Sequence, residues 1–244
     1  MSRARAGAGR RVVSLVPSLT ETLLEWGIRP VGVTRFCEVE GFPLVGGTKS
    51  PDISAIAALE PDVVLMDREE NRRPDAEALR AAGLTVVAVH VRSVADVGEA
   101  LDRVAAAVGH RGPVGAQQEQ PAGGGDAPPG APVAVWVPIW RRPWMTIGAA
   151  TYGTSVLAAS GFHNVYGDSA TAYPEMDLGD ARDRGPAFVL APSEPYPFKE
   201  RHRGELEQVA PVVFVDGKDL FWWGTRTPAA RRRLRRLAAE LAGR

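Results

Sequence analysis

The sequence has very little of what builds metal sites and disulfides. It contains one cysteine, Cys37, and four histidines among 244 residues. A single thiol cannot form an internal disulfide, and none of the common zinc-binding spacings can be assembled from these residues. We therefore expect no protein-bound metal and no cofactor of the protein's own.

An excess of charge of either sign is also lacking. The 29 Lys and Arg residues are balanced by 29 Asp and Glu residues, so no overall field attracts nucleic acid or a membrane surface. No apolar run approaches the roughly 20 residues of a membrane span. With 45% hydrophobic residues, the chain can build real cores, and we expect a folded monomer that binds no nucleic acid.

An export signal is not evident in the first residues. The stretch MSRARAGAGRRVVSLVPSLTETLLEWG has a basic start but no continuous apolar segment followed by a cleavage site. Arg10 and Arg11 resemble a twin-arginine signal only superficially, because a strand-like and a helix-like segment follow them. The expectation from this stretch is a cytoplasmic protein as written, or a periplasmic or cell-surface protein if the true start lies upstream.

The familiar catalytic patterns are missing as well. There is no GxSxG, no HExxH and no Cys–His pair at a recognisable spacing. Cys37 follows a predicted strand and could act as a nucleophile, although a small buried thiol is the commoner role for a single cysteine. We identify no catalytic residue.

What the chain does contain is a regular alternation of strand-like and helix-like segments, which indicates an α/β fold with parallel sheets. RVVSLV (11–16) has the pattern of a buried strand, and SLTETLLEWG follows as a helix that we expect Ser18 to cap and Gly27 to end. Further strands are predicted at 30–34, 62–66 and 84–91, with helices near 52–59, 72–82 and 93–108.

The alternation stops at residues 109–132, which are rich in Gly and Pro and predict a linker. After the linker the first pattern returns. VSLVPS is answered by VAVWVPIW, and PDVVLMDRE by PAFVLAPSE. We therefore predict an N-terminal lobe at 1–108 and a C-terminal lobe at 133–244, two Rossmann-like lobes with parallel sheets facing a central cleft.

Ligands of open parallel sheets bind beyond the carboxyl ends of the strands. Four tryptophans lie in such loops, namely Trp140, Trp144, Trp222 and Trp223. They could stack on a large planar or apolar ligand, or they could anchor their own loops by packing. Both alternatives stay open from the sequence.

Polar segments in the same loops have two interpretations. VGGTKSPD (45–52) could cradle an anion with Lys49, but its spacing favours a turn or lid. Acidic residues follow a strand in each half, and solvated helix starts explain them without a partner. The alternative is that Glu69, Glu70 or Asp75 in the first half, and Glu200 or Glu205 in the second, dock on a basic partner.

At RRRLRRLAAEL (231–241), Leu234, Leu237, Ala238 and Leu241 share one helical face. This spacing predicts an amphipathic helix that packs on the second lobe.

Several stretches together resemble the helical-backbone substrate-binding proteins of ABC importers, a family that includes cobalamin and ferric-siderophore receptors. They are SLVPSLTETLLEWGIRPVGVT, PWMTIGAATYGTSVLAASGFHNVY, PYPFKERH and VFVDGKDLFWWGTR. The resemblance implies two α/β lobes joined by one long helix, a ligand held between them, and delivery to a membrane permease. It also implies that acidic residues on each lobe contact permease arginines, for which Glu70 or Asp75 and Glu200 are the candidates.

Two departures from the family pattern stand out. The family's joining helix is expected after residue 108, yet the Gly/Pro-rich segment leaves room only for a short helix near 113–120. The histidine that often follows the Phe-Cys pair in similar sequences is missing around Val39.

The sequence therefore predicts a non-catalytic substrate-binding protein for a corrinoid or another metal chelate, such as cobalamin or a ferric siderophore, serving an ABC importer. The bound ligand would itself be a cobalt or iron chelate. A cytosolic enzyme or accessory protein of tetrapyrrole or metal metabolism is the alternative. The predicted ligand contacts are Ser18, Arg35, Phe36, Lys49, Trp140, Arg141, Trp144, Trp222 and Trp223.

Overall fold

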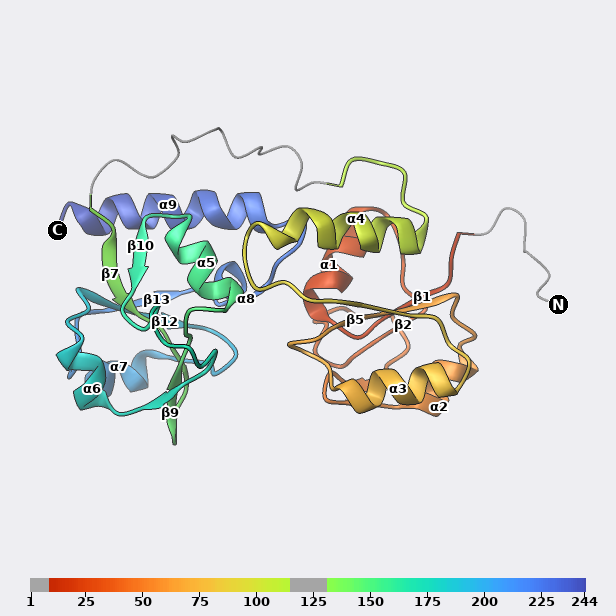
Figure 1. The fold of residues 1–244 in the computed structure, drawn as a ribbon, viewed down its shortest axis with the longest axis horizontal. Coiled ribbons are helices and arrows are strands. Elements are labelled where there is room, and N and C mark those ends of the chain that lie inside the picture. The colour runs from red at the N-terminus through yellow and green to blue at the C-terminus, as the bar shows by residue number, and fades with distance from the viewer. Residues whose placement is uncertain (1–8, 115–130) are drawn as a thin grey trace. The chain divides into compact units, whose positions relative to one another are not determined.

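The computed structural model describes residues 9–114 and 131–244, which form two compact units (Figure 1). The first contains residues 9–90 and 97–114, and the second contains residues 91–96 and 131–244. The short segment 91–96 belongs to the second unit although both its flanks belong to the first, and the backbone amide of Val94 donates to Ser155 Oγ at 3.0 Å. The helix predicted near 113–120 and most of the predicted linker lie outside the described residues.

The first unit is built on a parallel sheet with strand order β2-β1-β5-β6. The strands are β1 (Val12–Ser14), β2 (Gly32–Val33), β5 (Val63–Asp67) and β6 (Val86–Val89). Every residue of β5 is buried, as expected for a central parallel strand covered on both faces. A small antiparallel pair, β3 (Gly46–Gly47) and β4 (Ser50–Pro51), follows β2.

Helices cover both faces of this sheet. Figure 1 shows α1 (Pro17–Glu25) and α4 (Asp96–Val108) on one face, and α2 (Ile53–Ala58) and α3 (Arg73–Ala81) on the other. Ile56 of α2 and Leu79 of α3 pack with Val64 and Met66 of β5 in one buried cluster. The Asp52 side chain caps α2 by accepting from the backbone amide of Ala55.

The predicted cap of α1 is wrong. The helix begins at Pro17 with Val16 at the N-cap position, and no side chain caps it. Proline suits the first turn because its missing N–H would have no partner there. Ser18 consequently lies inside the first turn with 4% of its surface exposed, whereas Gly27 ends the helix with φ at 73°, as predicted.

The second unit repeats the topology of the first. Its parallel sheet has the order β10-β7-β12-β13. If the four strands of each sheet are numbered 1 to 4 along the chain, both sheets have the strand order 2-1-3-4. The strands are β7 (Val133–Trp136), β10 (Phe162–Asn164), β12 (Phe188–Pro192) and β13 (Val212–Val215). The shared order confirms the predicted α/β fold and agrees with the internal repeat seen in the sequence.

A three-stranded antiparallel sheet extends the second unit beyond β7. It consists of β8 (Pro138–Trp140), β9 (Trp144–Thr146) and β11 (Glu175–Met176) in the order β11-β9-β8. Helices α5 (Tyr152–Ala158), α6 (Leu178–Asp183), α7 (Arg203–Leu206), α8 (Lys218–Phe221) and α9 (Thr227–Ala242) complete the unit, and a 3₁₀ turn at Glu200–His202 precedes α7.

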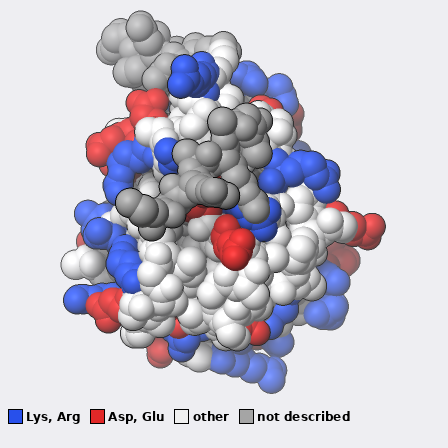
Figure 2. All heavy atoms as spheres, turned by 90° about the vertical axis from the view of Figure 1, so that its right-hand side faces the viewer, with Lys and Arg blue, Asp and Glu red and all other residues white. Residues whose placement is uncertain are grey.

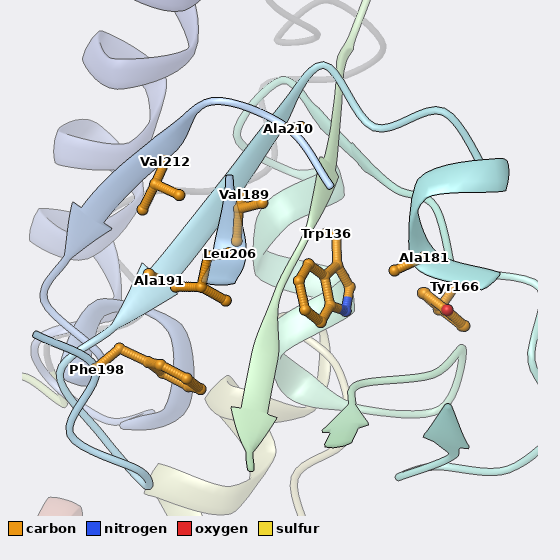
Figure 3. Packing of buried hydrophobic residues seen from close by; sticks show 9 residues of the cluster. All are labelled: Trp136, Tyr166, Ala181, Val189, Ala191, Phe198, Leu206, Ala210 and Val212. Carbon is orange, nitrogen blue, oxygen red and sulfur yellow. The ribbon is translucent and has the colours of Figure 1, made fainter. Parts of the chain in front are cut away.

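Trp136 lies fully buried in the core of the second unit (Figure 3). Val189 and Ala191 of β12 and Leu206 of α7 belong to the same cluster. Because α7 is a single short turn, burial of Leu206 in this core is what fixes its position. The predicted apolar face of α9 is also confirmed, since Leu234, Ala238 and Leu241 are buried.

Charges of both signs are interspersed on the face of the molecule shown in Figure 2, consistent with the balanced composition. None of the helices in the described ranges combines the length and apolar character needed to cross a bilayer.

A matched pair of tryptophans tests this packing. Trp136 is 0% exposed and Trp140 is 46% exposed. We expect Trp136→Ala to lower the free energy of unfolding by about 3–5 kcal/mol, because it leaves a large cavity in the core. Trp140→Ala should cost less than about 1 kcal/mol. Urea unfolding followed by circular dichroism measures both, and equal losses would contradict the arrangement.

Candidate functional site

In the first unit, Asn71 ties together the loops that follow the strands. Its side-chain nitrogen donates to the backbone oxygens of Thr48 at 2.9 Å and Leu15 at 3.3 Å, and its Oδ1 accepts from the Asp67 amide at 2.9 Å. The β3–β4 turn is thus fastened to the carboxyl ends of β1 and β5. Sequence analysis gave Asn71 no role, although its place in the polar run after β5 was a signal.

Arg35 and Phe36 follow β2 and present an aromatic surface. The Phe36 side chain is 49% exposed, and the Arg35 guanidinium carbon lies 4.9 Å from its ring centre. Gly47 lies beneath them, where a Cβ would come within 3.1 Å of Arg35 and 3.2 Å of Phe36. The glycine therefore lets both side chains lie close to the β3–β4 turn, and the predicted contacts Arg35 and Phe36 are exposed as a ligand site requires.

Cys37, next in the chain, points inward. Its residue is 3% exposed, and Sγ lies 3.2 Å from the hydroxyl oxygens of both Thr20 and Thr34. This is the setting of a structural buried thiol. The nucleophile alternative is therefore not supported.

Ser18 and Lys49 differ as candidate contacts. Ser18 is buried in α1, so the prediction that its side chain meets a ligand is not supported. Lys49 is exposed, but its ammonium donates to the backbone oxygen of Glu69 at 2.5 Å. The Glu69 carboxylate in turn contacts His90 Nε2 at 2.9 Å, so Lys49 is held against the loop after β5.

Asp67 is an unusual acid at the end of β5. It is 1% exposed, one oxygen accepts from the Glu69 amide at 2.7 Å, and within the described residues the other oxygen has no hydrogen-bond partner. Burial raises its pKa from 3.8 to about 6. The ionised form is therefore disfavoured in the folded protein.

A cavity of about 440 Å³ lies in the same unit, lined by residues of β5, β6, α3 and the loop before α3. None of the predicted ligand-binding or docking residues lines it.

In the second unit, Trp140 heads a cluster of aromatic rings. Its exposed ring meets Tyr196 edge-on, with centroids 5.6 Å apart and planes at 78°. Tyr196 contacts Phe198 at 4.8 Å, and Trp144 stacks on Phe198 at 6.0 Å while its edge meets Trp136 at 5.7 Å. Trp144 therefore anchors the cluster to the core, whereas Trp140 presents its ring to solvent.

Arg141 is bound within the protein rather than free for a ligand. Its Nε and Nη2 lie 2.7 and 2.6 Å from the same oxygen of Glu205. The hydrogen bond to Glu205 raises the pKa of Arg141, and the nearby Tyr196 hydroxyl acts in the same direction.

His202 packs against the same aromatic rings. It is 5% exposed, its centroid lies 5.6 Å from that of Tyr196, and its Nδ1 accepts from the Lys199 amide at 3.0 Å. Burial and the nearby Arg201 and Arg141 lower its pKa, so the ring is neutral at neutral pH.

Trp222 and Trp223, adjacent in the chain after β13, differ in their surroundings. Trp222 is half-buried, with Lys218 Nζ at 4.5 Å and the Arg226 guanidinium at 5.6 Å from its ring centre. Asp219 holds Arg226 at 3.3 Å. Trp223 is 5% exposed, which favours the packing alternative over the predicted ligand contact.

The three acidic docking candidates differ in the same way. Glu70 is exposed. Asp75 is 9% exposed, and the Arg72 guanidinium donates hydrogen bonds to both of its carboxylate oxygens at 2.7 and 2.8 Å. Asp75 is therefore poorly placed to contact a partner protein. The Glu200 side chain is 73% exposed and contacts Arg203, whose hydrogen bonds lower the pKa of Glu200.

No group of three or more His, Cys, Asp or Glu side chains within residues 9–114 and 131–244 is arranged to hold a metal ion. The exposed side chains among the predicted ligand contacts are the aromatic rings of Phe36 and Trp140 and the cationic groups of Arg35 and Lys49. Such groups recognise the organic periphery of a ligand.

Comparison with known proteins places this architecture. The periplasmic binding protein family matches residues 12–120. This match covers less than half of the chain, and it supports the resemblance to class III substrate-binding proteins of ABC importers. Members of that family bind substrates and are not enzymes, which favours the non-catalytic role over the enzyme alternative.

Individual relatives share both sequence and fold. The chain is 27% identical over 194 residues to the vitamin B12-binding protein of Salmonella paratyphi A, covering 75% of this chain and 72% of the relative. It is similar in fold to the periplasmic vitamin B12 binding protein BtuF of Vibrio cholerae, with a TM-score of 0.76 and 16% identity over 97% of this chain and 99% of the other. The periplasmic heme binding protein HutB of Vibrio cholerae gives a TM-score of 0.74 with 19% identity over 94% and 99% of the two chains.

The buried carboxyl of Asp67 predicts a pH-dependent stability. Because the Asp67 pKa is raised to about 6 from 3.8, the folded chain binds this proton more tightly than the unfolded chain. The stability contribution is fully present below about pH 3.8 and is lost as the pH rises through about 6. Asp67→Asn should therefore raise the free energy of unfolding by about 1–3 kcal/mol near pH 7.5 and by little near pH 4.

Urea unfolding at the two pH values measures this, with the exposed Asp183 changed to Asn as the control. A stabilisation that is equal at both pH values would contradict the assigned cause.

Proposed function

We propose that the chain binds a corrinoid or another metal chelate and delivers it to the permease of an ABC importer. The observation that carries the proposal is Trp140, a tryptophan left 46% exposed at the end of β8 and braced edge-on by Tyr196. Relatives named as vitamin B12-binding proteins, and solved neighbours titled as B12- and heme-binding proteins, support this class of ligand.

The chemistry of the exposed groups suits such a ligand. An aromatic ring held at a fixed angle loses little conformational freedom on binding and covers a large apolar area. Phe36, 49% exposed and flanked by Arg35, offers a comparable surface in the first unit. We propose that Trp140 is the contact for the apolar part of a chelate in the second unit. For the first unit, we propose Phe36 as the apolar contact and Arg35 and Lys49 as the polar contacts.

Trp222 is a second-rank ligand contact in this proposal. Its ring is half-buried with Lys218 and Arg226 over it, so a ligand would meet the edge of the indole together with cationic side chains. Trp144 supports the site by packing on Phe198.

For the permease, Glu70 and Glu200 are the proposed docking residues. Both are exposed at the start of segments that follow a central strand of their own unit, β5 and β12. We propose that the protein acts as a monomer in the periplasm or at the cell surface, a location supported by its structural similarity to periplasmic vitamin B12 and heme binding proteins.

Calorimetric titration with cyanocobalamin tests ligand binding. We expect a one-site isotherm for the wild-type protein and at least about tenfold weaker binding for Trp140→Ala, because a stacked ring contributes on the order of 1 kcal/mol beyond its buried area. Trp26→Ala is the matched control, since Trp26 stacks on His110 at 4.5 Å at the opposite end of α1 from the strand ends. An isotherm without heat at two temperatures for the wild type would overturn the corrinoid assignment.

Charge reversal tests the docking proposal separately. Glu70→Lys combined with Glu200→Lys should abolish chelate uptake in cells that carry the cognate permease while leaving the ligand Kd unchanged, because like charges would then face the permease arginines. Asp75→Asn should leave uptake largely intact, since Asp75 is already bound by Arg72. Loss of uptake with Asp75→Asn alone would contradict this assignment and make Asp75, rather than Glu70, the docking residue of the first unit.

A further inference from the structure

Arg141 follows the exposed Trp140 directly, yet its charge is already balanced. Two of its nitrogens approach one Glu205 oxygen at 2.6 and 2.7 Å, and the two side chains are 22% and 31% exposed. Hydrogen bonds between ionised groups at this distance are stronger than neutral ones, and partial burial reduces their screening by water. A ligand anion would have to displace Glu205 to reach the guanidinium.

The position of Glu205 is fixed by the core rather than by the loop. Glu205 lies on α7, and the next residue, Leu206, is 0% exposed in the cluster around Trp136. The neighbouring acids of this segment have a different partner: Glu200 and Glu207 both contact Arg203. Glu205 is therefore the carboxylate that neutralises Arg141.

The pair also connects to the aromatic surface itself. Arg141 follows Trp140 directly in the chain, and the Tyr196 ring meets the Trp140 ring edge-on with centroids 5.6 Å apart. Without Glu205, the unpaired charge of Arg141 would therefore lie beside the Trp140 ring, on which the ligand is proposed to stack.

We propose that Glu205 is a specificity-determining residue that selects a ligand with an uncharged periphery at Trp140. This inference rests on the proposed function and narrows its substrate class to chelates that present carboxamide or apolar groups at this surface. A ligand carboxylate placed there would gain no free cation and would meet the Glu205 carboxylate as a like charge. Discrimination by such a repulsive element is a general route to specificity.

The test compares two planar chelates of opposite peripheral chemistry. Cyanocobalamin carries carboxamides around its ring, and haemin carries propionate carboxylates. Dissociation constants are measured for both with the full chain by quenching of tryptophan fluorescence. The wild type should prefer cyanocobalamin.

Glu205→Gln should strengthen haemin binding by about tenfold and change cyanocobalamin binding by less than about twofold, because it frees the Arg141 charge. Rising salt should erode the gain. Glu207→Gln is the matched control: it removes the same charge two residues away, where the partner is Arg203 at 3.3 Å, and should leave both constants unchanged.

A double variant assigns the gain to Arg141. The double variant Glu205→Gln/Arg141→Gln should return haemin binding to the wild-type level. Its two glutamine side chains can still hydrogen-bond to each other, so it remains a usable protein if Glu205→Gln alone folds poorly. Thermal unfolding of each variant measures whether it folds. An unchanged ratio of the two constants in Glu205→Gln, an equal effect of Glu207→Gln, or a gain that survives Arg141→Gln overturns the inference. A wild type that binds neither chelate overturns the proposed function and this inference with it, whereas a wild type that binds one chelate without a shift in Glu205→Gln overturns only the inference.

Discussion

The burial of one central parallel strand in each unit is the constraint on which the rest of the structure depends. All five residues of β5 are buried, and so are four of the five in β12. A strand covered on both faces presents few side chains to solvent. In folds of this kind ligands bind beyond the carboxyl ends of the parallel strands, and Phe36, the acidic segments and Tyr196 follow such strands in this chain.

The aromatic side chains near the strand ends have two roles: some pack in the core, and others are exposed at the surface. Trp136 is at the centre of a core, Trp144 carries contact from that core to Phe198, and Trp140 stands exposed at the outer end. A chain of ring contacts thus joins the interior to the surface. An exposed ring supported in this way is held at a fixed angle without being enclosed.

Several charged side chains near the same loops form ion pairs within the protein. Arg141 is bound by Glu205, and Asp219 by Arg226 and Arg233. Partly buried charges require such partners, because desolvation without compensation is costly. The consequence is that an arginine beside a binding surface is not by itself an anion site, and its pairing decides which ligands the surface tolerates.

The sequence by itself determined the α/β class, the internal repeat, the loops that follow the strands and the family resemblance, because these depend on hydrophobic periodicity and local motifs that a linear chain carries. It predicted a loop for both Phe36 and Trp140; Phe36 does follow strand β2, whereas Trp140 is the last residue of β8. It could not assign Ser18, Trp223 or Asp75, whose burial is set by elements distant in the chain. Nor could it find the Arg141–Glu205 pair, which joins residues 64 positions apart. Only the tertiary structure decided which aromatic rings remain exposed and which charges are neutralised, because burial and pairing depend on neighbours that folding brings together.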